Sequence, residues 1–497
     1  MNPDTTHPTL PTLTTDLLTC PGSQVDNLFS KMWQKLNFNM LLVQSGFKKR
    51  SGTPAADVVY LLMLWVWLKV DSVGMFSRES LLSFSAAKKD ALYDLLNRED
   101  LNWRKLQLLT AKKVIRDTDS STLRAFVVDD SVKIRRGKKM PGVSSHFDHL
   151  TGRCVMGQQV LTLGLATETQ FVPLDNEIFI SNTKAQPLPD DFLDGRSIVA
   201  RRYHCAQQQS KPEMVRDMVK RALRSDIDAQ YFLADAWFAT KSIFKLTEEQ
   251  SLTAIVRMKK GKMKYRLTVN GVHHSLNADT LYRAHVNGQW QKIKGRPYQS
   301  KSITVELNLA QSSKEADHWL KVKLLFVRGV NEDKEQAGKH DWALFLTTDS
   351  QMDDETMLEI YALRWGIEVY FKEAKQKLGF LKEQSTHYST YIASIHLTAL
   401  RFCLLLSARH KEGAARLSDV RNTLSNSMRS LDFASRLWGM FRALIAGALD
   451  ELKVQFGEAM GDILRHIDHT VKQFFEQVMQ MDSFTLRLEA MPDKGCS

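Results

Sequence analysis

The sequence predicts an α/β protein whose sheet-forming middle is flanked by helical regions at both ends. Residues from about 25 to 116, and again from about 390 onward, carry the three-and-four spacing of apolar residues that is typical of amphipathic helices. From residue 123, short apolar and β-branched runs indicate strands, and residues 252–348 alternate between strand-like segments and turns. A chain of 497 residues is long enough for about two or three domains.

The N-terminal part divides into two segments. Residues 1–22 are rich in Thr and Pro and predict a flexible leader, whereas residues 23–120 are expected to be helical. The leader has neither a basic segment nor an apolar stretch, so no secretory signal is expected. The longest apolar run, residues 58–68, is shorter than the roughly 20 residues that span a bilayer, so it predicts a buried helix and no membrane partner.

The bulk composition narrows the class of protein. Hydrophobic residues make up 43% of the chain and charged residues 25%, which excludes a disordered protein. The formal net charge of +12 favours a polyanionic partner such as nucleic acid or an anionic membrane. The five cysteines are scattered and form no CxxC pair, which argues against a disulfide framework or a zinc ribbon. A reducing compartment fits best, so we expect a cytoplasmic protein.

Two apolar runs in the middle of the chain each end in an acid. Residues 123–128 lead into Asp129, and the run YFLA leads into Asp235, so both acids are expected at the ends of central strands. Carboxylates at such positions can hold divalent metals, and their hard oxygens suit Mg²⁺ or Mn²⁺. An apolar run that ends in Asp is also frequent in α/β proteins, where Asp caps the next element, so each acid alone has a structural interpretation as well.

The segment YALRWGIEVYFKEAKQKLGF, from residue 361, predicts one amphipathic helix. Because an α-helix advances about 100° per residue, four polar side chains fall within about 60° of one another beside its apolar stripe: Tyr361, Arg364, Glu368 and Lys375. An Arg–Glu pair at this spacing is usually an exposed ion pair worth a few tenths of a kcal/mol. The set of four, together with the two upstream acids, is what indicates a functional site.

These four residues resemble the Tyr-Arg-Glu-Lys signature of the insertion-sequence-4 family of bacterial DDE transposases, at the same spacing. The resemblance covers about residues 120–385. It implies a catalytic, metal-binding triad of Asp129, Asp235 and Glu368, with Mg²⁺ as the cofactor and Mn²⁺ as a substitute.

The resemblance also implies an organisation of the chain. An RNase-H-like core would comprise residues 121–250 and 351–390, with residues 251–350 as a β-rich insertion. Residues 23–120 would bind transposon ends, and residues 391–497 would form a helical C-terminal region with a possible role in dimerisation. Intramolecular packing explains the amphipathic faces of that last region equally well.

The activity implied is cut-and-paste transposition of an insertion sequence. Family members nick one DNA strand with water and use the freed 3′-hydroxyl to attack the other strand, which gives a hairpin before joining to target DNA. The partners would be double-stranded DNA, as terminal inverted repeats and target, and a second copy of the chain in a homodimer. The location would be the bacterial cytoplasm, at the nucleoid.

The resemblance assigns DNA contacts to five residues. Tyr361, Arg364 and Lys375 would hold the strand being cut. Trp342 resembles the tryptophan that receives a flipped base, and Trp365 resembles the aromatic residue that probes the vacated stack. Stacking of a base on an aromatic side chain is worth about 1–3 kcal/mol.

Two questions stay open at this level. The first acidic site is a doublet, Asp129 and Asp130. The family often shows Asp-x-Ser here, which favours Asp129 with Ser131, but strand alternation leaves Asp130 as an alternative because neighbouring side chains point to opposite faces. The alternatives to a transposase are a stand-alone RNase-H-like endonuclease and a domesticated DNA-binding protein without chemistry.

Overall fold

The computed structural model describes residues 28–49, 51–85, 87–148, 152–285, 289–312, 314–329, 341–413 and 416–451. The expected leader over residues 1–22 lies outside these ranges. The chain divides into two compact units. One unit contains residues 1–106, 377–385 and 389–497, and the other contains residues 107–376 and 386–388. The N-terminal and C-terminal helical regions therefore belong to the same unit.

The described part of the first unit is helical, as the apolar periodicity predicts. Its elements are α2 (Leu28–Lys35), α3 (Phe38–Gln44), α4 (Ala55–Leu64), η1 (Trp65–Leu68), α5 (Val73–Glu79), η2 (Leu81–Ser83), α6 (Lys89–Asn97), α14 (Tyr388–Glu412) and α15 (Leu417–Glu451). A buried arginine on α14, Arg401, donates to the carbonyl groups of Leu62, Met63 and Leu378. The last carbonyls of a helix have no partner within it, so Arg401 caps the end of α4 and ties α14 to it.

Helix α14 is also long and apolar enough to cross a membrane by length and composition alone. Its apolar window, residues 388–410, is entirely buried within the protein, which is equally typical of a core helix. The apolar run at residues 58–68 forms α4 and η1 and is almost completely buried, as expected.

The second unit is built on one large mixed sheet. Its strands are β1 (Ala125–Ile134), β2 (Ser144–Asp148), β3 (Arg153–Ala166), β4 (Phe171–Phe179), β5 (Tyr231–Ala234), β6 (Thr253–Arg257), β7 (Lys264–Val269), β8 (Val272–Asn277), β9 (Gln291–Lys292), β10 (Tyr298–Asn308), β11 (Trp319–Gly329) and β12 (Trp342–Thr347). Its helices are α7 (Trp103–Thr118), which begins in the first unit, α8 (Ile198–Gln208), α9 (Lys211–Arg224), α10 (Lys241–Glu249), α11 (Ala278–His285), α12 (Asp354–Ala362) and α13 (Trp365–Gln376). The overall class is the α/β architecture that the sequence predicts.

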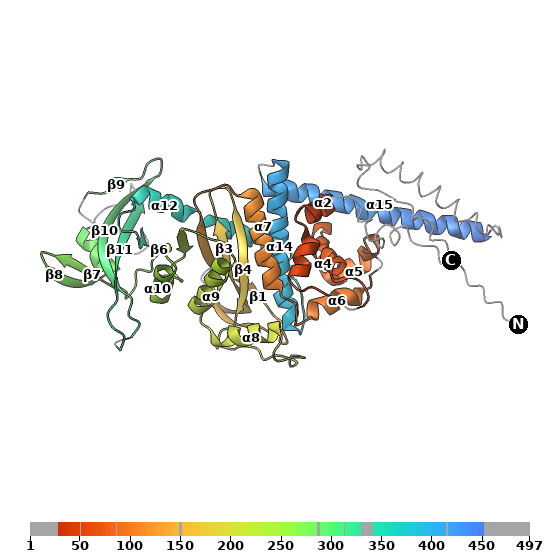
Figure 1. Ribbon diagram of the computed structural model, residues 1–497, viewed down its shortest axis with the longest axis horizontal. Coiled ribbons are helices and arrows are strands. Elements are labelled where there is room, and N and C mark those ends of the chain that lie inside the picture. Colours follow the sequence, from red (N-terminus) through yellow and green to blue (C-terminus); the bar gives the residue numbers. More distant parts are fainter. Residues whose placement is uncertain are drawn as a thin grey trace. The chain divides into compact units, whose positions relative to one another are not determined.

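The order of the strands divides the sheet into an inner half, strands β1 to β6, and an outer half, strands β7 to β12. The path runs β2-β3-β1-β5-β6-β12-β11-β10-β7-β8, with β4 also paired to β3 and β9 to β10. Strands β1, β5 and β6 are parallel, and β3 and β4 are antiparallel to their neighbours. Figure 1 shows the hairpin β7–β8 at the end of this unit farthest from β3 and β4. The β-rich segment expected over residues 251–350 thus continues the same sheet.

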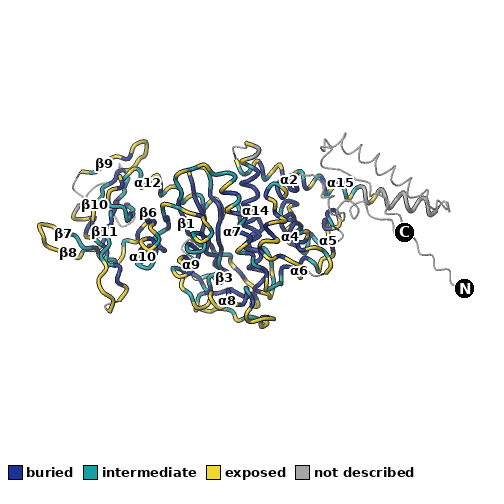
Figure 2. Tube along the Cα trace, in the orientation of Figure 1, coloured by how far each residue is buried: buried dark blue, intermediate teal, exposed yellow. Residues whose placement is uncertain are grey.

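Burial follows this division. The first four residues of β1 are completely buried, and the last ten residues of β3 are buried on both faces. In contrast, β8 is exposed along almost its whole length, as the yellow hairpin in Figure 2 shows. Strands with continuous apolar runs are those covered on both faces, so the inner half of the sheet forms the core of this unit.

The single helix expected from residue 361 is in fact two helices. Helix α12 ends at Ala362, α13 begins at Trp365, and at the junction the N–H of Arg364 bonds to the carbonyl of Tyr361 (3.1 Å), three residues back. A Cβ on Gly366 would lie 2.8 Å from Cβ of Phe171 on β4, so only glycine permits this close approach of α13 to the sheet. The apolar periodicity continues across the junction, and for that reason the sequence pattern does not reveal the break.

Candidate active site

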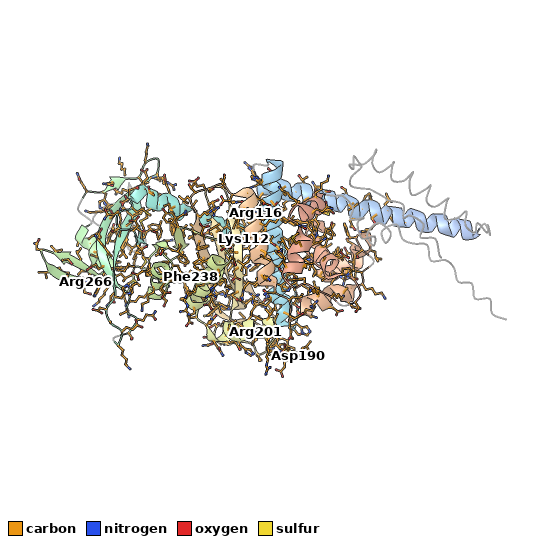
Figure 3. The ribbon with its side chains drawn as sticks, viewed as in Figure 1. Lys112, Arg116, Asp190, Arg201, Phe238 and Arg266 are labelled. Atoms are coloured by element: carbon orange, nitrogen blue, oxygen red, sulfur yellow. The ribbon has the colours of Figure 1, made fainter. Side chains whose placement is uncertain are left out.

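Asp129 and Asp235 are brought together by the register of two parallel strands. Val128 of β1 lies opposite Ala234 of β5, and each acid is the next residue in its chain. Parallel neighbours are about 4.8 Å apart, so the two carboxyl groups extend from adjacent backbones. The loop after β5 is anchored by Phe238, labelled in Figure 3, which is 1% exposed and whose N–H donates to the Asp235 carbonyl (3.2 Å).

The expected position of Asp129 at a strand end is wrong in one respect. Strand β1 continues for five more residues to Ile134, because β3 pairs with it along its whole length. Only the pairing with β5 stops at Val128. Asp129 therefore lies in mid-strand, at the point where one neighbouring strand leaves the sheet.

The environment of Asp129 disfavours its charge. Burial, and next the charge of Asp235, raise the pKa of Asp129 to about 7. The N–H of Asp130, which donates to Asp129 Oδ1 (2.8 Å), and the guanidinium of Arg364 oppose this rise. A perturbed carboxyl group beside a second one is typical of functional sites.

The two acids of the doublet have different partners. Asp130 Oδ2 accepts from Lys211 Nζ (2.6 Å), and Asp130 Oδ1 accepts from Gln159 Nε2 (2.7 Å). Lys211 is 6% exposed, and its Nζ lies 4.2 Å from the ring centroid of Trp237. Asp130 is thus engaged in a buried ion pair, whereas Asp129 faces Asp235 and the helix junction.

Arg364 connects Asp129 to Glu368. Its Nη1 donates to Asp129 Oδ2 (3.0 Å), and its Nη2 donates to Glu368 Oε1 on the first turn of α13. The side chains of Arg364 and Asp129 are only 17% and 20% exposed, so water screens this pair weakly. Three of the expected site residues are therefore linked directly, and Asp235 joins them through its proximity to Asp129.

Tyr361 and Lys375 lie around this cluster. The ring of Tyr361 packs edge-on against Phe345 (4.9 Å between centroids), and burial raises the pKa of its hydroxyl. Burial, followed by the charge of Lys133, lowers the pKa of Lys375, while Asp129 and Asp130 act in the opposite direction. The four residues of the signature thus surround one acidic centre, although they lie on two helices and a turn.

The carboxylates fit a divalent metal only in part. Asp129 and Asp235 offer hard oxygen ligands, and their mutual repulsion is what a cation would relieve. Glu368 is held by Arg364, and in the described ranges no three Asp, Glu, His or Cys side chains are close enough to share one ion. Asp129 and Glu368 both accept from Arg364, whereas Asp235 forms no ion pair in the part of the chain that the structure describes.

The two candidate tryptophans differ sharply in exposure. Trp342, on β12, is 5% exposed and lies parallel to the ring of Tyr282, with 4.2 Å between centroids and 2° between planes. Lys260 Nζ lies 4.0 Å from the Trp342 ring centroid. Trp365, beside Arg364, is 65% exposed. An aromatic side chain open to a base is thus found at Trp365, whereas Trp342 is packed against other side chains.

Two features of the site were not anticipated from sequence. Lys211 lies on α9, far along the chain from Asp130, and no local pattern marks it out from Lys220, the other lysine of that helix. The close contact of Gly366 with Phe171 left a weak signal, since a glycine inside an amphipathic pattern often marks a packing constraint. Gly164 of β3 makes room for the same Phe171 ring. The two glycines allow Phe171 to pack closely against both β3 and α13, the helix that carries Glu368.

The site is thus a half-buried pair of carboxyl groups beside a cationic helix junction, on a mixed α/β sheet. Residues 70–306 match the family model described as DDE superfamily endonuclease. The matched range contains Asp129 and Asp235 and ends before Glu368. This match supports a DDE-type nuclease or transposase-like family for the chain.

Other comparisons add little. No curated protein matches the sequence at a significant level. Among solved structures, the crystal structure of the NurA nuclease from Sulfolobus solfataricus is similar, with 11% sequence identity over 56% of this chain and 82% of that chain, and a TM-score of 0.23. At that TM-score we draw no conclusion about fold or activity from the likeness.

Proposed function

We propose that this protein is a DNA transposase of an insertion sequence, of the insertion-sequence-4 type, that cleaves and joins DNA at the acidic centre. The observation that carries the proposal is the linkage of Asp129 to both Asp235 and Glu368, through strand register and through Arg364. A DDE superfamily endonuclease match over residues 70–306 supports the same class of chemistry.

The strand order supports an RNase-H-like core. Strand β3 is antiparallel to both of its neighbours β4 and β1, and β1 is followed in space by the parallel strands β5 and β6. That arrangement of three antiparallel and two parallel strands is the one the RNase-H-like fold uses. Strands β7 to β12 extend the same sheet. In the chain they lie between β6 and α13, the helix that carries Glu368, and this is where the insertion is proposed.

Each side chain has a proposed role. Asp129, Asp235 and Glu368 would hold Mg²⁺, or Mn²⁺ in its place, which when bound activates a water or 3′-hydroxyl and neutralises charge on the phosphodiester. Arg364 and Lys375 bind phosphate oxygens, and the hydroxyl of Tyr361 donates to the same strand. Trp365 is the exposed ring beside these groups and stacks on an unpaired base in a hairpin intermediate.

The proposed partners are double-stranded DNA, as terminal inverted repeats and target, and a second copy of this chain in a synaptic homodimer. The net charge of +12 supports a polyanionic partner. The proposed setting is the bacterial cytoplasm, at the nucleoid.

The test is a cleavage assay with the full chain, Mg²⁺ and DNA that carries the ends of its own element. Wild type is compared with Glu368→Gln and with Glu373→Gln, which makes the same charge change on the same helix α13. We expect cleavage at the element boundary and a hairpin-sized product on denaturing gels from wild type and Glu373→Gln, and no product from Glu368→Gln.

Other outcomes would redirect the assignment. Cleavage without any hairpin or joined product would favour a stand-alone endonuclease. Binding without cleavage, in Mg²⁺ and Mn²⁺ alike, would contradict the proposal and favour a DNA-binding protein that has lost its chemistry.

A further inference from the structure

Arg364 lies between two acids of the candidate active site. Its guanidinium donates to Asp129 on the sheet and to Glu368 on α13, so one cation bridges two of the three acids. The third acid, Asp235, has no such cation among the ion pairs of the described ranges, and its charge still acts on Asp129. Arg364 therefore partly neutralises Asp129 and Glu368, but it does not pair with Asp235.

A guanidinium and a divalent cation compete for the same carboxylate oxygens. A planar guanidinium that donates through two nitrogens forms strong, directional hydrogen bonds with carboxylates, and equally with the oxygens of a phosphodiester. A phosphate group placed at the helix junction thus offers Arg364 an alternative acceptor. When Arg364 takes it, oxygens of Asp129 and Glu368 become available together.

The backbone at Arg364 suits such an exchange. Arg364 lies in the two-residue turn between α12 and α13, so its side chain can reorient without breaking either helix. The first turn of α13, which carries Glu368, begins one residue later.

We infer that Arg364 is a gate between DNA and metal: in the DNA-free protein it blocks divalent-cation binding by holding Asp129 and Glu368, and a DNA phosphate releases it. This inference rests on the proposed function and adds a regulation to the same site. By linkage, DNA then raises the affinity for the metal by the same factor as the metal raises the affinity for DNA. A metal centre that closes only on DNA would protect the free protein from unproductive hydrolysis.

The test measures Mn²⁺ binding to the DNA-free full chain by electron paramagnetic resonance, with no cleavage readout. Arg364→Ala is expected to bind Mn²⁺ at least about fivefold more tightly than wild type, the lower end of typical coupling between two sites. Arg364→Lys keeps the charge but loses the two-nitrogen contact, so its Mn²⁺ affinity should lie between those of wild type and Arg364→Ala. Thermal melting confirms that each variant is folded.

Lys375→Ala is the matched control. It removes a positive charge from the same neighbourhood, where Asp129 and Asp130 both act on Lys375, but Lys375 forms none of the ion pairs found in the described ranges. We expect a smaller gain in Mn²⁺ affinity from Lys375→Ala than from Arg364→Ala. A short DNA duplex should then tighten Mn²⁺ binding in wild type and have little effect in Arg364→Ala.

The outcomes separate the gate from the proposed function. Equal Mn²⁺ affinities for wild type and Arg364→Ala, or a larger gain from Lys375→Ala, would overturn the gate, while cleavage by wild type would leave the transposase proposal intact. Absence of Mn²⁺ binding in every protein, with and without duplex, would overturn both.

Discussion

An ion pair in the outer half of the sheet contrasts with a pair of acids in the inner half. In the outer half, Arg266 of β7 pairs with Glu306 of β10 (2.7 Å) and lies over the ring of Trp319 (3.7 Å from its centroid). In the inner half, Asp129 and Asp235 stand side by side, and burial together with this pairing raises the pKa of Asp129 to about 7. Compensated charges are typical of structure, and uncompensated buried ones of function.

The contrast between these two places indicates where a bound cation would lower the free energy, namely beside Asp129 and Asp235. In the outer half, Arg266 is paired with Glu306, and Trp342 stacks on Tyr282, so these groups find their partners within the protein. The inner half keeps a repulsion between Asp129 and Asp235, which the N–H of Asp130 and the guanidinium of Arg364 oppose at Asp129. The following changes would break or sharpen this comparison, and we give them from the largest expected effect to the smallest.

The largest loss of stability is expected from Lys211→Met. The change leaves Asp130 as a buried charge without its cation, which costs about 3–5 kcal/mol. The matched control is Lys245→Met, because Lys245 pairs with Glu315 at 2.8 Å but both side chains are partly exposed. That change should cost about 0–1 kcal/mol. Urea denaturation of both variants measures the difference, and equal losses would contradict the idea that burial makes the Lys211–Asp130 pair the more important of the two.

Asp129→Asn is expected to stabilise the protein above neutral pH. In the unfolded chain this carboxyl group has its ordinary pKa of 3.8 and in the folded protein a pKa of about 7, so folding retains a proton between these values. Stability of wild type from this group therefore falls as the pH rises from about 4 to 7. One pKa unit is worth about 1.4 kcal/mol, so we expect a gain of about 2–3 kcal/mol at pH 8 once the lost pair with Arg364 is allowed for.

The measurement is the melting temperature of wild type and Asp129→Asn from pH 4 to pH 9 without divalent metal. The advantage of the variant should grow up to about pH 7 and stay constant above it. An advantage that does not change with pH would show that Asp129 is charged throughout and that Asp235 does not oppose it.

Gly366→Ala is expected to cost about 1–3 kcal/mol, because the added Cβ overpacks the contact with Phe171. Gly195→Ala is the control, since a Cβ there meets nothing within 4 Å. Thermal melting gives the stability difference, and the same preparation should show reduced DNA cleavage as α13 and Glu368 move from the sheet. Unchanged cleavage would mean that the position of α13 is not set by this contact.

The smallest change in stability is expected from Trp365→Ala, within about 0.5 kcal/mol, because its side chain is mostly exposed. If Trp365 stacks on an unpaired base, hairpin-sized products should decrease, since such stacking is worth about 1–3 kcal/mol. Trp342→Ala serves as the buried comparison, and it should cost as much as Lys211→Met, about 3–5 kcal/mol, because its side chain is packed in the outer half. Denaturing gels and melting curves distinguish the two, and a stable Trp342→Ala would contradict its core position.

Local patterns in the sequence carried part of the site. Two apolar runs that end in acids predicted central strands, and the mixed α/β class followed from how these segments alternate with helices. Such patterns succeed because strand and helix periods are properties of neighbouring residues. The same logic predicted one helix from residue 361, which was wrong because the apolar periodicity continues across the junction between α12 and α13.

By itself, then, the sequence determined the strands, the order of the acids and a basic chain suited to polyanions. Only the tertiary structure decided which acid of the doublet faces the junction, since Lys211 of α9 takes Asp130 and Arg364 takes Asp129. Neighbouring strand residues point to opposite faces of the sheet, and the element that packs on each face decides which partners a side chain there can contact. Arg364 and Asp129 are 235 residues apart, so their contact is a product of folding that no local pattern encodes.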